Sequence, residues 1–273
     1  MVNLSGLTHL LADLPAYRRF LDELRSGQPD RAPLALYGAA RAFVVASLVQ
    51  AVQRPALYVV ARSEHARQVC DELQVWLPHD GMAARADDPT AIPLYYFADP
   101  DSLPYERVAW SRETRQSRLG ALSALAQRSS AGGPLLIVAS ARSLMQKTLP
   151  PRELRLALKT LRTGQMIDLQ GTLTRWMGLG YRSDAVVEEV GQLSRRGGIV
   201  DIWPPNLPWP VRIELFGDEI DSLRHFDPAT QRTLPDARNL AEVLVGPASE
   251  AMPRYGAAAQ ERLDALDRAP LHP

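Results

Sequence analysis

The sequence predicts an α/β protein that combines a parallel-sheet domain with a smaller antiparallel α+β domain. Two observations predict this fold class. Over residues 1–150, short apolar runs alternate with helical stretches, which is typical of a parallel sheet covered on both faces. After Pro150-Pro151 the apolar residues change to a period of two and turn residues become frequent, which is typical of antiparallel strands.

The first part is predicted to contain four buried strands and three helices. The strands are expected at Leu34–Tyr37, Ala56–Ala61, Pro93–Ala98 and Leu135–Ser140. The helices are expected at Ala39–Val52, Glu64–Trp76 and Glu113–Gln127. Cys70 is the only cysteine and lies in the second of these helices, where we expect a small buried side chain.

Residues 35–42, from the first predicted strand into the first predicted helix, occupy the place of a nucleotide-binding P-loop and have lost its nucleotide-binding residues. A P-loop needs Gly, four residues, Gly, Lys and then Ser or Thr, and these positions hold Ala35, Ala40, Arg41 and Ala42. Methyl groups would stand where the backbone must approach phosphates, and Ala42 has no hydroxyl for magnesium. We therefore expect no bound nucleotide or other cofactor. On this segment alone, an ordinary strand–turn–helix unrelated to a P-loop is the favoured interpretation.

The second part is predicted to mix one helix with several short strands. Alternation at Leu154, Leu156 and Leu158 predicts a half-buried strand. Asp168 is expected to cap a helix over Leu169–Met177, which Gly178 and Gly180 end. Further strands are expected at Ala185–Val190, Gly198–Trp203, Val211–Phe216 and Glu219–Phe226. Beyond Gly246-Pro247, a last helix is expected at Ala257–Asp267, in a third segment that we expect to be cut short.

Gly217-Asp218 predicts a tight two-residue hairpin turn between the last two strands. In the simplest register Phe216 faces Glu219, Glu214 faces Asp221 and Arg212 faces Leu223. The core face then holds Val211, Ile213, Leu215 and Ile220. The opposite face then holds Arg212, Glu214, Phe216, Glu219, Asp221 and Leu223. An aromatic side chain exposed beside an arginine is typical of an interface anchor. On these residues alone, packing of Phe216 and Leu223 under a loop or a neighbouring domain is an equally good alternative.

The composition argues against a dedicated nucleic-acid binder, a metal-binding protein and a membrane protein. Lys plus Arg equals Asp plus Glu, at 31 each, so there is no basic excess of the kind that a dedicated nucleic-acid binder shows. The five histidines have no ligand spacing, and no metal site is expected. A single cysteine fits a reducing cytosol, and no apolar run reaches the length of a membrane span. We expect a cytoplasmic protein without a membrane partner, and a core position for Trp203.

The most specific motifs lie between residues 180 and 232. They are Gly180-Tyr181-Arg182, Val187-Glu188, residues 196–204 (RGGIVDIWP), residues 212–224 (RIELFGDEIDSLR), Phe226-Asp227-Pro228 and Thr230-Gln231-Arg232. Together they resemble the UvrB-homology module of the bacterial transcription-repair coupling factor family, Mfd. Two further segments agree with this resemblance: Leu103-Pro104-Tyr105-Glu106, and Gly246-Pro247-Ala248 with Glu250.

This resemblance implies a layout and a binding site. It implies a degenerate P-loop, helicase-like domain in two pieces, residues 1–150 and 244–273, with an α+β domain inserted at 151–243. In UvrB and Mfd the inserted domain is the docking surface for UvrA. Three positions match those that the family uses at this contact: Arg196, Arg212 and Phe216. Arg195 is an alternative to Arg196. Truncation of each of the three is expected to weaken UvrA binding and leave the fold intact, because strand alternation sets Arg212 and Phe216 opposite the core face.

The function that the resemblance implies is that of a non-catalytic adaptor that recruits UvrA to link stalled transcription to nucleotide excision repair. RNA polymerase and DNA would be bound only through other parts of the full-length protein, an ATP-dependent DNA translocase. One alternative is an ATP- or DNA-handling enzyme like UvrB itself. Residues 99–111 are too few for the hairpin with which UvrB clamps damaged DNA, which argues against it. Another alternative is a structural brake that binds the rest of its own chain.

Overall fold

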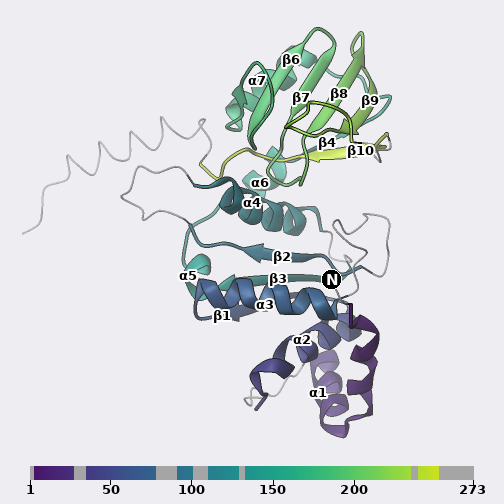
Figure 1. Ribbon diagram of the computed structural model, residues 1–273, viewed down its shortest axis with the longest axis vertical. Coiled ribbons are helices and arrows are strands. Elements are labelled where there is room, and N and C mark those ends of the chain that lie inside the picture. The colour runs from purple at the N-terminus through teal and green to yellow at the C-terminus, as the bar shows by residue number, and fades with distance from the viewer. Residues whose placement is uncertain are drawn as a thin grey trace, which may run out of the picture. The chain divides into compact units, whose positions relative to one another are not determined.

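A computed structural model of the chain describes residues 3–27, 35–77, 91–100, 110–128, 133–234 and 239–251. Contacts divide the described residues into two compact units. The first is drawn from 1–100 and 128–146, and the second from 101–127 and 147–273. Both units mix helices with strands (Figure 1), which agrees with the predicted α/β class. The insertion of one domain into another, and its boundaries at 151 and 243, stay predictions.

The first unit is built on a three-stranded parallel sheet. Its order is β1 (Pro55–Val60), β3 (Leu135–Ser140) and β2 (Leu94–Phe97), and these confirm three of the four predicted strands. Two predicted helices, α2 (Gly38–Val52) and α3 (Ser63–Trp76), pack their apolar residues against β3. Cys70 lies in this core, where burial raises the pKa of its thiol to about 12, as expected of a small buried side chain.

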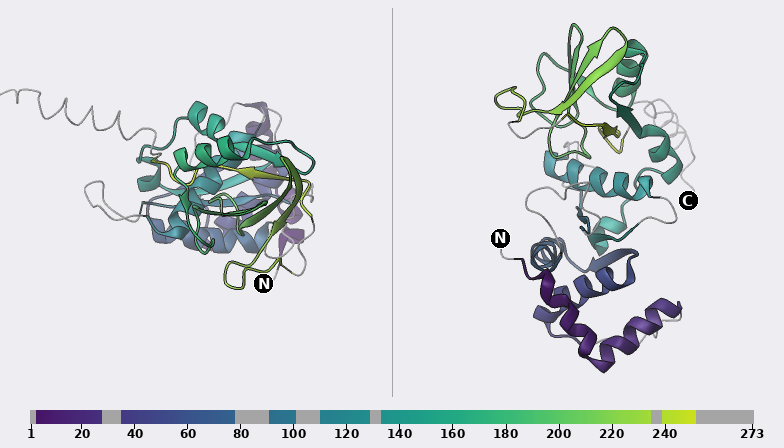
Figure 2. Two further views of the ribbon diagram at one scale, coloured as in Figure 1. Left: turned by 90° about the horizontal axis from the view of Figure 1, so that it is seen from above. Right: turned by 90° about the vertical axis from the view of Figure 1, so that its right-hand side faces the viewer.

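Two N-terminal elements and one short helix were not predicted. The 3-10 helix η1 (Ser5–Asp13) and helix α1 (Pro15–Ser26) form a V beside α2, drawn in purple in Figure 2. The Tyr17 hydroxyl lies 2.7 Å from the Ser47 hydroxyl of α2. Gly27 follows α1 with a left-handed φ of 74°, a conformation that glycine adopts without strain. Helix α5 (Ala141–Leu144) follows β3 directly, and the Ser140 side chain caps it.

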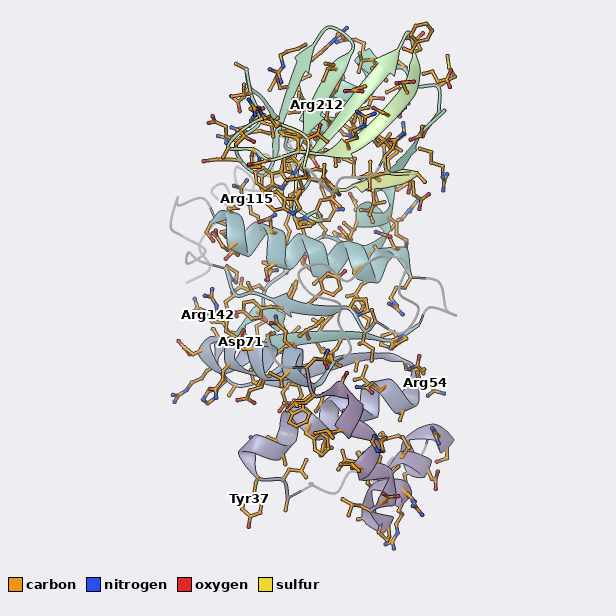
Figure 3. The ribbon with its side chains drawn as sticks, turned by 45° about the vertical axis from the view of Figure 1, so that its right-hand side comes forward. Tyr37, Arg54, Asp71, Arg115, Arg142 and Arg212 are labelled. Carbon is orange, nitrogen blue, oxygen red and sulfur yellow. The ribbon has the colours of Figure 1, made fainter. Side chains whose placement is uncertain are left out.

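The strand predicted at Leu34–Tyr37 is wrong in its described residues. Residues 35–37 pair with no strand, and Leu36 packs into the cluster of η1, α1 and α2 rather than into the sheet. Tyr37 precedes α2 and is 92% exposed, pointing away from the protein in Figure 3. The helix that follows is confirmed, with Arg41 exposed and Ala42 buried on it. The comparison of this segment with a P-loop stays a prediction.

The second unit contains a five-stranded sheet and a two-stranded sheet. The larger sheet runs in chain order through β5 (Arg182–Ser183), β6 (Gln192–Arg196), β7 (Ile199–Ile202), β8 (Val211–Phe216) and β9 (Glu219–His225). All its pairs are antiparallel except β5 with β6. The smaller sheet pairs β4 (Lys159–Arg162) with β10 (Glu242–Val245).

One core holds this unit together. Leu161 of β4, Trp176 of α7 (Leu169–Gly178) and Ile213 of β8 meet in it, with helices α4 (Arg112–Gln127) and α6 (Pro151–Ala157) contributing further leucines. Helix α7 begins as predicted, because the Asp168 carboxylate accepts a hydrogen bond from the Gly171 amide at 3.0 Å. Trp203 is fully buried in a smaller cluster, as predicted.

Two strand predictions in this unit are wrong, and one predicted helix lies outside the described residues. Leu154 and Leu156 lie in helix α6, and Leu158 directly follows it. The buried residues of this helix, Leu154 and Ala157, are three positions apart, which is the spacing of a helix and not the alternation of a strand. Val187 and Val190 pack with Trp203 without forming a strand, and the strand is β6, which follows them. The helix predicted at Ala257–Asp267 lies outside the described residues.

Candidate protein-binding site

Two tight turns place Arg196 and Phe216 at the same end of the five-stranded sheet. Arg196 pairs with Ile199 around Gly197-Gly198, and Phe216 pairs with Glu219 around Gly217-Asp218. Gly197 and Gly217 have φ values of 60° and 61°, which only glycine adopts without cost in turns of this kind. Since β6 and β8 run in the same direction, both side chains stand at the last strand position before a turn.

The predicted hairpin is confirmed, but its register shifts at a bulge. Phe216 faces Glu219 as expected, and the bulge between Glu214 and Leu215 moves every later pair by one residue. Arg212 therefore faces Arg224 rather than Leu223. Leu223 is fully buried in the core, so its predicted place on the charged face is wrong.

We define the outer face as the side of the five-stranded sheet opposite the core residues Val200, Ile213 and Leu223. Residues that pair directly lie on the same face of a sheet. The register therefore builds three rows across the outer face. The base row is Ser194, Asp201, Arg212 and Arg224; the middle row is Arg196, Ile199, Glu214 and Ser222; the tip row begins with Phe216 and Glu219.

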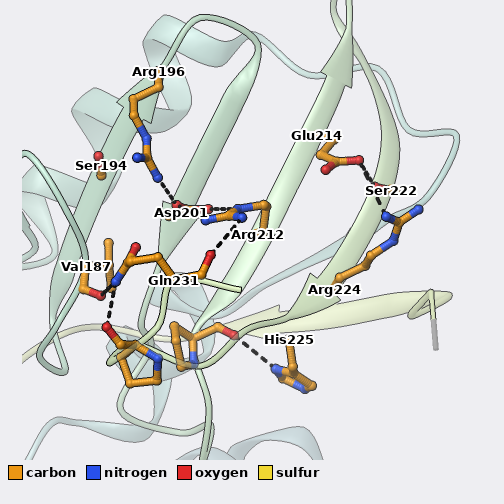
Figure 4. A network of polar contacts seen from close by, with 12 residues as sticks. Val187, Ser194, Arg196, Asp201, Arg212, Glu214, Ser222, Arg224, His225 and Gln231 are labelled. Atoms are coloured by element: carbon orange, nitrogen blue, oxygen red, sulfur yellow. Dashed lines mark hydrogen bonds and ion pairs between the residues drawn. The ribbon is translucent and has the colours of Figure 1, made fainter. Parts of the chain in front are cut away.

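The base row is organised around Asp201, a carboxylate that is 1% exposed. Arg212 donates to it through two nitrogens, Nε to Oδ1 and Nη2 to Oδ2, each at 2.8 Å. Arg196 donates to Oδ2 through Nη2, also at 2.8 Å. Figure 4 shows the two guanidinium groups approaching this one carboxylate from either side. A buried charge is stable only when it is paired in this way.

Arg212 is largely committed to contacts within the chain. Its Nη1 donates to the Gln231 carbonyl oxygen at 3.2 Å, and its guanidinium carbon lies 4.8 Å from the centre of the Phe226 ring. The hydrogen bond to Asp201 raises the pKa of Arg212, so its charge is fixed. The side chain is 16% exposed, against 49% for Arg196. The two arginines that the resemblance assigns to one contact thus differ in their availability.

A second charge contact compensates the remaining cation of the base row. Arg224 stands directly opposite Arg212, an arrangement that is unfavourable without a counter-charge. Glu214 supplies one, because its Oε2 lies 4.0 Å from Arg224 Nη1 and accepts a hydrogen bond from the Ser222 hydroxyl at 2.7 Å. The base and middle rows therefore balance most of their charge internally.

The tip of the outer face carries an exposed aromatic side chain. Phe216 is 83% exposed, so the alternative that it packs under a loop is wrong within the described part of the chain. Ile199, one row away, is also exposed, at 36%. An exposed Phe ring on the same sheet face as a half-exposed arginine is a common composition of a protein-binding hot spot.

Sequence reasoning missed Asp201 and Gln231. Asp201 sits between Val200 and Ile202 on a central strand, and a carboxylate in such a run signals a buried charge that needs cationic partners. Gln231 has a left-handed φ of 59°, which places its carbonyl toward Arg212 and its side-chain amide toward the Val187 carbonyl. Nothing in the local pattern predicts that conformation.

Other kinds of site find no support in the part of the chain that the structure describes. Those residues hold no cluster of three or more His, Cys, Asp or Glu side chains placed to bind a metal ion. Nor does any helix there combine the length and apolar character needed to cross a membrane.

The part of the chain that carries the outer face is similar in sequence to known DNA repair proteins. Residues 160–250, which include all three rows, match the family described as the UvrB interaction domain. The resemblance inferred from the motifs is confirmed. The transcription-repair-coupling factor of Myxococcus xanthus is 36% identical over 92% of this chain, and that of Mycobacterium bovis is 32% identical over 85%. The UvrABC system protein B of Methanococcoides burtonii is 26% identical over 85%.

The chain spans only part of each of these relatives. It covers 20% of the Myxococcus protein, 18% of the Mycobacterium protein and 35% of the Methanococcoides protein.

Proposed function

We propose that this chain is a non-catalytic adaptor region that recruits UvrA and so links stalled transcription to nucleotide excision repair. The observation that carries the proposal is the exposed Phe216 on the same outer face as the half-exposed Arg196, in a sheet that matches the UvrB interaction domain. RNA polymerase and DNA would be engaged by other parts of a longer protein, as in the coupling factors that the chain resembles.

The chemistry of the outer face suits a protein partner with an acidic, partly apolar surface. Phe216 offers a large apolar side chain that is costly to leave in water. Arg196 shares Asp201 with Arg212 and remains half-exposed, which leaves it able to form charge-assisted hydrogen bonds with a partner carboxylate. Arg212 would support the contact by holding Asp201 in place.

The direct test is a calorimetric titration of UvrA with this chain. We expect saturable binding that Phe216→Ala weakens. Leu156→Ala is the matched control, since Leu156 is 62% exposed on α6, a helix that packs against the core side of the sheet. Absence of binding by the parent protein contradicts the proposal, and so does equal weakening by the control.

An ATP- or DNA-handling enzyme is the second candidate, favoured by the similarity to UvrABC system protein B. Ala35, Ala40, Arg41 and Ala42 argue against it, because they offer neither the close backbone approach nor the Lys and hydroxyl that bind a nucleotide and its magnesium. We expect no ATP binding by calorimetry and no turnover above a buffer blank. Micromolar ATP affinity would contradict the adaptor function and favour this alternative.

A further inference from the structure

A short extended segment, far from the hairpin in sequence, pairs with the outer edge of β9. Residues 164–167 run antiparallel to the start of β9. The Gly164 amide donates to the Ile220 carbonyl at 2.8 Å, the Ile220 amide to Gln165 at 2.9 Å, and the Ile167 amide to Asp218 at 2.9 Å. Met166 thereby becomes the direct partner of Glu219.

This pairing places Met166 in the tip row of the outer face. Phe216 pairs with Glu219 on one side, and Met166 pairs with Glu219 on the other, so all three side chains share one face. Two strand spacings of about 4.8 Å separate the backbones of Phe216 and Met166 by roughly 10 Å. Ile167, the next residue, points the opposite way and is buried in the core.

Met166 is 66% exposed, although a polar residue at this position would satisfy the same backbone bonds. A single exposed apolar side chain needs no explanation. Two of them flank Glu219 in one cross-strand row, and with Ile199 of the neighbouring row they form a discontinuous apolar strip along the tip of the sheet. Methionine is flexible and polarizable, and it adapts to the shape of a partner surface.

The charges around this strip are asymmetric. Asp218, Glu219 and Asp221 are all exposed at the hairpin tip, whereas Arg196 stands at the β6 side. An Oε1 atom of Glu219 reaches to within 3.9 Å of the position that a Cβ atom would take at Gly164, beside Met166. A partner that fits this tip therefore offers a carboxylate at the Arg196 end and hydrogen-bond donors near Glu219, between its contacts with Phe216 and Met166.

We propose that the docking surface extends beyond the β8–β9 hairpin onto residues 164–167 and that Met166 is a contact residue within it. The proposal rests on the proposed function, since the occupant is the same UvrA surface that receives Phe216. That surface offers an apolar groove with a place for Phe216 and a place for Met166, and hydrogen-bond donors between the two for Glu219. The position of Arg196 at the β6 side fixes the direction in which the groove lies.

Met177 provides a matched control within the same unit. It is 43% exposed, and it lies on α7, the helix whose Leu173 and Trp176 pack against the core side of the sheet. Met177 therefore belongs to an element that forms no part of the outer face. The same substitution at 166 and at 177 changes an exposed methionine on and off that face.

The experiment is a titration of UvrA with the parent, Met166→Ala, Met166→Glu and Met177→Glu, together with thermal melting of each. We expect Met166→Ala to weaken binding about fivefold and Met166→Glu to weaken it further, because a carboxylate would enter the apolar groove. Met177→Glu should bind like the parent. All variants should melt like the parent, since residues 164–167 are held by backbone hydrogen bonds.

The outcomes separate this inference from the function on which it rests. If Phe216→Ala weakens binding and both Met166 variants bind like the parent, the extension is wrong and the proposed function stands. If Met177→Glu weakens binding as much as Met166→Glu, the surface is not confined to the outer face and the extension is wrong. If the parent does not bind UvrA, the proposed function fails and this inference fails with it.

Discussion

The base and the tip of the outer face differ in chemistry and in exposure to water. At the base, Asp201 is 1% exposed and its two partners, Arg196 and Arg212, neutralise it within the chain. At the tip, Phe216 and Met166 are exposed and apolar, and folding gains nothing from them there. The base therefore serves the stability of the sheet, and we infer that the tip serves binding.

Arg196 stands between these two roles. It shares a carboxylate oxygen with Arg212, yet about half of its side chain is in water. A resemblance of motifs cannot separate Arg196 from Arg212, because both are arginines on the same face. Their burial separates them, and mutations that measure stability and binding independently can test the distinction.

The largest effect is expected for Arg212→Ala, and it is on stability. Removing one partner of a buried ion pair typically costs 3–5 kcal/mol, and we expect about 3 kcal/mol because Arg196 still contacts Asp201. This reverses the expectation from strand alternation that truncating Arg212 leaves the fold intact. Denaturant unfolding measures it. Arg195→Ala, at the exposed neighbour of Arg196, is the control, and an equal small effect in both variants would contradict the structural role of Arg212.

The next largest effect is expected for Phe216→Ala, and it is on binding. Truncating an aromatic anchor typically costs about 2 kcal/mol or more, which is roughly thirtyfold in affinity for UvrA. Its melting temperature should match that of the parent, since Phe216 is 83% exposed. Ile213→Ala, three positions earlier and fully buried, should instead lose roughly 2–5 kcal/mol of unfolding free energy. Similar melting of the two variants would place Phe216 in the core.

Arg196→Ala should have a smaller effect, shared between the base and the tip. We expect about 1 kcal/mol in binding free energy, roughly fivefold, because the side chain is half-exposed and its charge is screened. The difference from the parent should shrink as salt is raised. Stability should change little, because Arg212 keeps both of its bonds to Asp201. A binding loss that is independent of salt would argue against a charge contact.

The smallest effect is expected on the pH dependence of the unfolding free energy, through His225 at the end of β9. Burial lowers the pKa of His225 below its ordinary value of 6.5, partly opposed by the hydrogen bond that Nδ1 donates to the Pro210 carbonyl at 3.2 Å. The unfolded chain therefore takes up a proton at a higher pH than the folded chain does. This contribution to stability is present above pH 6.5 and is lost as the pH falls toward the folded pKa.

His225→Gln should remove that part of the pH dependence. Comparison of the unfolding free energy of variant and parent on either side of pH 6.5 measures it. If the two lose stability in parallel as the pH falls, His225 makes no such contribution.

The predictable parts of the fold were those set by local pattern. The Gly217-Asp218 turn fixed the hairpin, and Asp168 fixed the start of α7. The bulge at Glu214 was not predictable, because it depends on how β9 pairs rather than on either strand alone. Helix α6 was mistaken for a strand because three leucines alternate there, whereas the burial of Leu154 and Ala157 follows the helical period.

The candidate site, too, contains residues whose positions local pattern predicts and residues whose positions it does not predict. Phe216 was predictable because it directly precedes a turn and falls opposite the core residues of its strand. Leu223 was misplaced by the bulge, and Asp201 was overlooked although its apolar neighbours mark it as buried. Met166 carries no local signal, because its position depends on pairing with Glu219, more than fifty residues away in the sequence. Long-range pairing is what a single sequence reveals least.

The central claim, that the tip of the outer face meets UvrA, is tested most directly by site-specific photo-crosslinking. Phe216 is replaced by the photoreactive p-benzoylphenylalanine, and Leu156 is replaced by it in a second variant as the matched exposed position on α6. Each variant is irradiated with UvrA, and the adducts are resolved by mass. The account predicts a covalent adduct with UvrA from position 216 and none from position 156. An adduct from position 156 alone would contradict it.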